Sequence, residues 1–244
     1  MLRAVGRLRP VRQAASATRL ASTSPLAGAS SSVRSEVAAS FSADSETALA
    51  LRAQMEDGGM ANAVCSAAAS IHRSTHGTGG TCLVTGIGKS GLVAARLAAS
   101  LTSVGCRAQF VHAAEWAHGE LGLLGTPGIL LAITHSGSTS EVTAVCMEAR
   151  QRRVPVVAIA GRDGADVVGG ASSHTLAYSL PPGALDPFGG VPASSIVAQE
   201  MVCNALVRAV AVLADFTSVD FARNHPGGML GVKLRGGGDG GGSQ

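Results

Sequence analysis

Short apolar runs alternate with longer amphipathic stretches through the middle of the chain. The apolar runs hold four to seven residues without a polar interruption, which indicates strands buried on both faces of a sheet. Residues at helical spacing separate these runs, and Gly58-Gly59 divides two further helices that precede them. We expect strands at 81–85, 108–112, 128–134, 154–160 and 174–180, and helices at 44–57, 60–73, 89–104, 139–152 and 194–216. The alternation predicts a three-layer α/β/α sandwich of the doubly wound type, with a mostly parallel five-stranded sheet.

The two ends of the chain differ from the middle. Residues 1–35 carry six arginines but no lysine and no acid, and Ser and Ala fill the gaps. This composition is typical of an organellar transit peptide, so we expect a mitochondrial location more than a plastid one. A cytoplasmic location is expected if the segment is only a disordered tail. Residues 236–244 are almost all Gly and predict a second disordered tail, which leaves 43–235 as the folded domain.

Composition and charge exclude several classes of protein. The chain is 46% hydrophobic and 3% aromatic, which suits a sizeable, aliphatic core. Outside residues 1–35 lie 13 of the 19 basic side chains and all 16 acidic ones, and the resulting net charge of −3 disfavours a nucleic-acid partner. The longest uncharged stretch, 121–140, contains Gly, Pro, His and Ser, so we expect no membrane span there. The five cysteines form no CxxC pair and no zinc spacing.

Two predicted strand-to-helix loops are suited to bind an anion. The first is GIGKSG at 86–91 and the second is THSGSTSE at 134–141. Small residues at a helix N-terminus leave backbone N–H groups free to bind phosphate, and the helix dipole favours a negative charge there. The hydroxyls of Ser136, Ser138 and Thr139 add further donors. Ligands of doubly wound sheets bind at the carboxyl ends of the strands, where both loops are expected.

Two nucleotide-binding interpretations of the first loop fit poorly. The loop matches G-x-G-x-x-G, but a dinucleotide site also needs an acid at the end of the next strand. That strand is expected to end at His112, and the nearest acid is Glu115 beyond it. A Walker A loop would need Gly at position 83, where the chain has Leu83. We therefore expect no nucleotide and no redox cofactor.

Ionisable side chains cluster near these loops. His112, Glu115 and His118 recur every three residues, a pattern with metal-ligand types but without the HExxH spacing, and we expect no metal. Lys89 lies in the first Gly-rich loop and is one of only two lysines in the chain. A lysine fits a tight anion site as a compact point charge.

Two other residues admit a structural interpretation beside a functional one. Glu141 follows the second loop and is expected in the first turn of a helix, where a carboxylate is favoured as a cap. His225 lies in the HPGG turn near the end of the chain, and a histidine in such a loop is often only solvated.

Four motifs in this order resemble a known family. The segments GIGKSG, VHAAEWAHGELG, ITHSGSTSE and HPGGMLG are similar to those of the sugar isomerase (SIS) domain of D-arabinose-5-phosphate isomerases. The resemblance covers roughly residues 43–235. Many members carry a pair of CBS domains after the HPGG motif, whereas this chain ends 19 residues after His225 and so resembles a short form.

The resemblance implies an aldose–ketose isomerase that interconverts D-ribulose 5-phosphate and D-arabinose 5-phosphate through an enediol(ate), without a cofactor. It implies a homodimer or homotetramer in which a neighbouring chain completes each active site. The catalytic residues that it implies are Lys89, His118, Glu141 and His225. The residues that it implies for sugar-phosphate binding are Gly88, Ser90, Ser136, Gly137, Ser138, Thr139, Ser194 and Ser195.

The chain departs from the family pattern at several positions. A second functional glutamate of the family falls on Ala184, and Asp186 lies two residues later. Glu120 replaces an aspartate, Ala193 a threonine, and His135 an asparagine of the phosphate loop. A non-catalytic sugar-phosphate-binding regulatory protein therefore remains an alternative, as does another phosphosugar isomerase of the hexulose or heptose type, although the motifs argue against the latter.

Overall fold

The computed structural model describes residues 26–184, 186 and 190–227. The chain forms two compact units, Met1–Ala38 and Ala39–Gln244. Helix α1 (Leu26–Glu56) begins in the first unit and ends in the second. It starts 18 residues before the helix predicted at 44–57 and within the segment predicted as a transit peptide.

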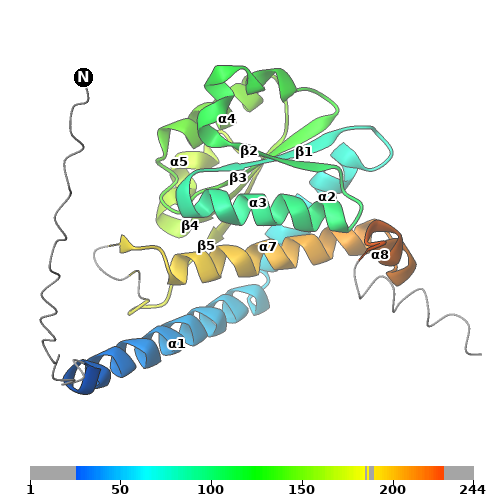
Figure 1. Ribbon diagram of the computed structural model, residues 1–244. Coiled ribbons are helices and arrows are strands. Elements are labelled where there is room, and N and C mark those ends of the chain that lie inside the picture. The colour runs from blue at the N-terminus through cyan, green and yellow to red at the C-terminus, as the bar shows by residue number, and fades with distance from the viewer. Residues whose placement is uncertain (1–25, 185, 187–189, 228–244) are drawn as a thin grey trace, which may run out of the picture. The chain divides into compact units, whose positions relative to one another are not determined.

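The second unit is built on a five-stranded sheet in which every pairing is parallel (Figure 1). The strand order is β2-β1-β3-β4-β5. Of the three inner strands, β3 and β4 are buried at every residue, as the uninterrupted apolar runs predicted. The doubly wound α/β/α sandwich is therefore confirmed. The strands are β1 (Thr81–Gly86), β2 (Ala108–His112), β3 (Gly128–Ile133), β4 (Val156–Gly161) and β5 (His174–Tyr178).

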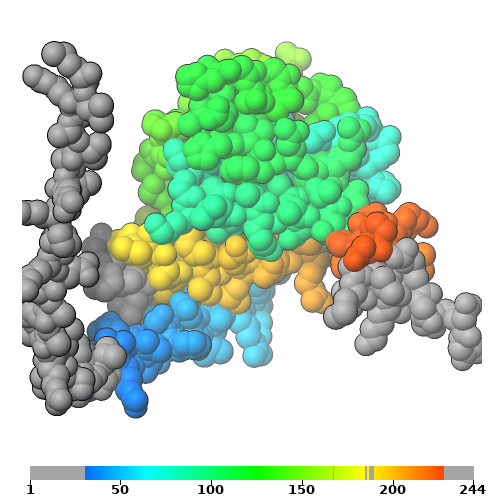
Figure 2. All heavy atoms as spheres, viewed as in Figure 1, coloured from blue at the N-terminus to red at the C-terminus, as the bar shows by residue number. Residues whose placement is uncertain are grey.

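Helices cover both faces of this sheet. One face packs on α2 (Gly59–Thr75), α3 (Gly88–Ser103) and α7 (Ser194–Leu213), and the other on α4 (Ser140–Gln151) and α5 (Arg162–Gly169). A hydrophobic core lies on each face of the sheet, and successive residues of a strand point alternately into one core and the other. Leu131 thus faces α2, α3 and α7, while Leu130 faces the opposite layer. Figure 2 shows α3 and α7 next to each other on the surface of the first helical layer.

Helix α7 is the most apolar of the helices in this unit. Its length and composition would suit a membrane span. Its inner face, with Val202 and Leu206, nevertheless belongs to the core shared with α2 and α3. We therefore interpret α7 as a core helix.

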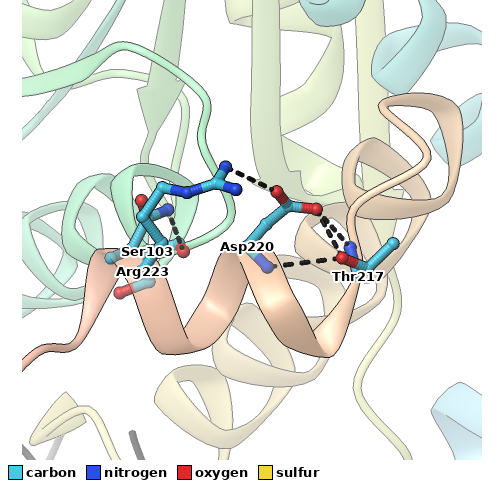
Figure 3. Close-up of polar contacts among 5 residues, drawn as sticks. Ser103, Thr217, Asp220 and Arg223 are labelled. Atoms are coloured by element: carbon cyan, nitrogen blue, oxygen red, sulfur yellow. Dashed lines mark hydrogen bonds and ion pairs between the residues drawn. The ribbon is translucent and has the colours of Figure 1, made fainter. Parts of the chain in front are cut away.

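Four short elements were absent from the sequence prediction. They are 3₁₀-helices η1 (Ala113–His118) and η2 (Glu120–Leu123), helix α5, and helix α8 (Ser218–Asn224). Glycines at both ends of the short α5 segment obscured its periodicity. A capping box between Thr217 and Asp220 starts α8 (Figure 3), and this Thr-x-x-Asp pattern was a signal that the sequence offered.

The order of the strands creates a crevice at one edge of the sheet. The chain moves from β1 outward to β2 and then returns past β1 to β3. Helices α3 and α4, which follow β1 and β3, therefore lie on opposite faces of the sheet. The carboxyl ends of two such neighbouring strands form the usual ligand-binding crevice of a doubly wound fold. Both predicted anion loops begin there.

Candidate active site

The loop after β1 leads into helix α3, whose N-terminus has no side-chain cap and lies at the carboxyl ends of the strands. A side chain at Gly86 would lie about 3 Å from the backbone of Ser90, Gly91 and Ile133, so the tight turn into α3 requires glycine. No side chain caps α3, whose N-cap is Ile87. The N–H groups of its first turn therefore have no side-chain acceptor and are available to an anion. Lys89 is exposed in that first turn.

The loop after β3 carries a group of hydroxyl side chains. Ser136 Oγ accepts hydrogen bonds from Ser138 Oγ at 2.9 Å and from the Ser138 N–H at 3.3 Å. Neither bond uses the Ser136 proton, which can therefore be donated to a ligand. Thr139 is the N-cap of α4 but makes no side-chain cap, so the first turn of α4 also has N–H groups for a ligand, apart from that of Glu141, which bonds to its own carboxylate.

Close backbone packing fixes the shape of the second loop. Gly137 has a φ of 67°, which favours glycine, and a Cβ atom there would collide with the carbonyl of Gly164 in α5. Beside the contact lies a pocket of about 430 Å³, lined by His135, Ser136 and Arg162 among others. The loop is therefore held rigidly against α5 while its serine side chains stay exposed.

Glu141 lies at the mouth of a second pocket, of about 450 Å³, between η1 and α4. Hydrogen bonds from its own N–H and from Ser140 Oγ lower the pKa of Glu141, and nearby His112 lowers it further. Glu141 is therefore a carboxylate at neutral pH. The indole of Trp116 fixes η1 to the sheet through a 2.9 Å hydrogen bond to Thr85 Oγ1.

His118 is the last residue of η1 and is exposed. Because residues three apart align in a 3₁₀-helix, Glu115 lies on the same side of η1 as His118. His112 precedes η1 and accepts a hydrogen bond from the Ala114 N–H on its Nδ1. Among the residues that the structure describes, no three His, Cys, Asp or Glu side chains form a metal-binding group.

The start of α7 uses Asp186 as a cap. The Asp186 carboxylate accepts hydrogen bonds from the Ala193 N–H at 2.8 Å, the Ser195 N–H at 3.2 Å and Ser195 Oγ at 2.7 Å. Burial opposes the charge, but these three donors lower the pKa of Asp186 below its ordinary value. Ser194 and Ser195 are buried, and the Ser195 hydroxyl is committed to Asp186. Ala184 supplies no carboxylate nearby.

A hydrogen-bond chain with two buried inner members joins the two anion loops, and sequence reasoning did not find it. Gln199 Nε2 lies 3.1 Å from Ser90 Oγ and 3.1 Å from Tyr178 Oη, which is 2.8 Å from His135 Nδ1. Gln199 and Tyr178 are fully buried. The available signal was a single amide on the inner face of an otherwise apolar helix, four residues after Ser195.

His225 lies far from the other predicted residues of the same chain. It follows α8, whose Asn224 Nδ2 donates to the carbonyl of Ser103, the last residue of α3. Lys89 lies at the opposite end of α3. The 14 residue steps from Lys89 to Ser103 span about 21 Å along the helix axis at 1.5 Å per residue. The His225 ring stacks on Phe221 at 3.9 Å. Of the predicted residues, those of the two loops and the start of α7 are brought together, His118 lies on the adjacent loop, and His225 is separate.

Comparisons with known proteins agree with this fold. Arabinose 5-phosphate isomerase KdsD of Salmonella typhi is 38% identical over 155 residues, which are 64% of this chain and 47% of that protein. Arabinose 5-phosphate isomerase GutQ of Escherichia coli K12 is 36% identical over 155 residues, covering 64% of this chain and 48% of that protein. The chain thus spans about half the length of the curated relatives that it matches.

A solved structure and a family model extend the comparison. Escherichia coli CFT073 c3406, solved in complex with arabinose 5-phosphate, superposes with a TM-score of 0.66 at 22% identity, over 80% of this chain and 98% of that one. The model of the SIS domain matches residues 80–209, more than half of the chain. The chain therefore belongs to the SIS domain family.

Proposed function

We propose that this protein is an aldose–ketose isomerase that interconverts D-ribulose 5-phosphate and D-arabinose 5-phosphate. The observation that carries the proposal is the 36–38% identity to arabinose 5-phosphate isomerases KdsD and GutQ. The crevice supports it, since two uncapped helix N-termini and an exposed lysine converge where a phosphate would bind.

The described residues can supply each part of such a reaction. The loop of Ser136, Gly137, Ser138 and Thr139 anchors the phosphate and so holds the reacting carbons still. Isomerisation moves a proton between C1 and C2 through an enediol(ate), which needs a base and a positive charge near the developing oxyanion. Glu141 is an exposed carboxylate suited to proton transfer, and Lys89 supplies the charge.

The test is a proton NMR assay in deuterated water. The full chain is mixed with ribulose 5-phosphate, and we expect arabinose 5-phosphate that carries deuterium at C2. Lys89→Met should abolish turnover, whereas Arg107→Met should retain it, because Arg107 binds the Gly79 carbonyl at the opposite edge of the sheet. Formation of another sugar phosphate would identify a different isomerase of the same family.

A non-catalytic sugar-phosphate-binding regulatory protein is the second candidate, and one observation favours it. The family glutamate is replaced by Ala184, and Asp186, the nearest described acid, is committed to α7. If ribulose 5-phosphate perturbs the spectrum of the protein without a new sugar and without deuterium exchange, the regulatory function is supported and the isomerase proposal fails.

We also propose a homodimer or homotetramer in which His225 enters the crevice of a second copy. The support is the separation of His225 from Lys89 within one chain. Mixing and refolding inactive Lys89→Met and His225→Ala proteins should restore part of the activity, because some crevices then combine an intact lysine with an intact histidine. Two active single variants, or mixtures that stay inactive, would contradict a shared site.

Finally, we propose that residues 1–35 direct the protein to mitochondria. The support is their six arginines without an acid. Import into isolated mitochondria should yield a shortened chain. An intact Met1 on protein isolated from its own cells would contradict the proposal and indicate an unprocessed tail.

A further inference from the structure

The hydrogen-bond chain Ser90–Gln199–Tyr178–His135 connects side chains from four separate elements. Ser90 lies in the first turn of α3, Gln199 in α7, Tyr178 at the end of β5, and His135 in the loop after β3. Ser90 and His135 thus belong to the two anion loops, while the two inner members are fully buried. Gln199 Oε1 is also buried and has no hydrogen-bond partner among the described residues.

The chemistry of the chain permits two arrangements of its protons. Gln199 Nε2 only donates, so with Nε2 toward Tyr178 and Ser90 both hydroxyl oxygens accept from it. The Tyr178 proton then needs another acceptor, and His135 Nδ1 lies 2.8 Å away. This arrangement requires a neutral His135 with an unprotonated Nδ1. It leaves the Ser90 proton directed outward, available to an anion.

Protonation of His135 reverses the chain. The imidazolium Nδ1–H must donate to Tyr178 Oη, so the Tyr178 proton needs an acceptor on its other side. A turn of the Gln199 amide places Oε1 there, and Oε1 then also accepts the proton of Ser90. One amide atom stays unpaired in either orientation, so the preferred orientation depends on whether His135 Nδ1 carries a proton, as it always does in the imidazolium form.

We propose that His135 acts, through Tyr178 and Gln199, as a proton-linked positioning residue that controls whether the Ser90 hydroxyl can donate to a bound phosphate. The inference rests on the phosphate-binding part of the proposed function. Burial raises the pKa of Tyr178 well above its ordinary value, so the phenol stays protonated in both arrangements.

Several charged or titratable groups lie near His135. Arg162 and Asp163 of α5 line the same pocket. Asp186, from the segment before α7, interacts with His135 electrostatically, and Tyr178 of β5 contacts it directly. Tyr178 is the member of this set that bonds to Gln199, so the response of His135 to a change at Gln199 reports on the hydrogen-bond chain.

The first test is the titration of the His135 imidazole in the ligand-free full chain, followed by ¹H–¹⁵N NMR and assigned with His135→Asn. Gln199→Met should lower the titration midpoint by about one pH unit, because the imidazolium form then leaves the buried Tyr178 proton without an acceptor. In a Tyr178→Phe background, which removes one oxygen, the same Gln199→Met change should have no effect. An unchanged or raised midpoint in Gln199→Met, or an equal shift without the Tyr178 hydroxyl, would overturn the inference.

The second test measures the dissociation constant of inorganic phosphate for the wild type and Ser90→Ala. The ratio of the two constants should be about fivefold larger above the His135 midpoint than below it. Ionisation of phosphate itself cancels in this ratio. In His135→Asn the ratio should not change with pH, and a pH-dependent ratio there would refute the coupling. Both tests measure titration or phosphate binding and need no turnover. Their results can therefore be interpreted even if the isomerase proposal fails.

Discussion

Replacement of Asp186 by alanine tests whether the carboxylate of this residue has a structural or a catalytic role. Asp186 is the described acid nearest in sequence to Ala184, where the family pattern has a functional glutamate. In the structure its carboxylate accepts hydrogen bonds from the Ala193 N–H, the Ser195 N–H and Ser195 Oγ at the start of α7. We therefore expect Asp186→Ala to affect folding first.

The magnitude follows from the three hydrogen bonds. Loss of a side-chain cap at a helix N-terminus costs about 1 kcal/mol, and loss of the hydrogen bond from the Ser195 hydroxyl costs about 1 kcal/mol more. The expected decrease in the free energy of unfolding is about 2 kcal/mol, which lowers the melting temperature of a chain of this size by about 4–8 °C. Asp57→Ala, at an exposed turn where no side-chain hydrogen bond is described, should leave the melting temperature unchanged.

The pH dependence gives a second, independent check. The folded state lowers the pKa of Asp186 below its ordinary value of 3.8, so the unfolded chain binds this proton more readily. The stabilisation is therefore complete above pH 3.8 and is lost as the pH falls through the folded pKa. The difference in melting temperature between wild type and Asp186→Ala should accordingly be constant near neutrality and shrink in acid.

Calorimetry across this pH range, together with the NMR turnover assay, completes the experiment. A cap that only positions Ser195 should leave turnover within about tenfold of wild type, since removal of a general acid or base costs about 10²–10⁴-fold. An unchanged melting temperature combined with a loss of that larger size would refute the reasoning and identify Asp186 as the substitute for the family glutamate.

Three further changes test the fold around the crevice. Gly137→Ala should lower the free energy of unfolding in urea by about 2 kcal/mol or more because of its positive φ and its collision with α5, whereas Gly122→Ala, in open space, should not. Trp116→Phe should cost about 1–2 kcal/mol in the same assay by leaving the buried Thr85 hydroxyl without its donor, and adding Thr85→Val should recover part of this loss. Leu206→Ala, in the core of α7, should cost about 2–5 kcal/mol; a value near zero would contradict its burial.

The layers of the fold were predictable because buried segments are recognisable in the sequence as runs or periodic patterns of apolar residues. Strands β3 and β4 were predicted within two residues of their observed bounds, since strands covered on both faces become uninterrupted apolar runs. Strand β2 was predicted with its observed bounds although only one of its five residues is buried. Helix α5 was missed because its eight residues include two glycines and give too short a period. Helix α8 was missed although its capping box is visible in the sequence.

The two anion loops were predictable for a different reason. Each lies within one continuous segment that contains the end of a strand, the small residues and the start of a helix. Tyr178 and Gln199 could not be recognised in this way, because Gln199 meets Ser90 across 109 positions of sequence. The identity of a polar residue on a buried helix face indicates that it needs a partner, but only the packing of α3 on α7 determines which one.

The position of His225 is decided by topology rather than by its motif. Ser90 contacts Gln199, and Arg96 contacts Asn204 farther along both helices, so α3 and α7 run in the same direction. Both start at the carboxyl edge of the sheet, and α7 is about 30 Å long at 1.5 Å per residue. A residue soon after α7 must therefore emerge at the opposite edge, where the bond from Asn224 to the end of α3 holds this segment. The HPGG motif predicts a functional histidine, and the parallel course of α3 and α7 supports our proposal that the crevice it serves belongs to another copy of the chain.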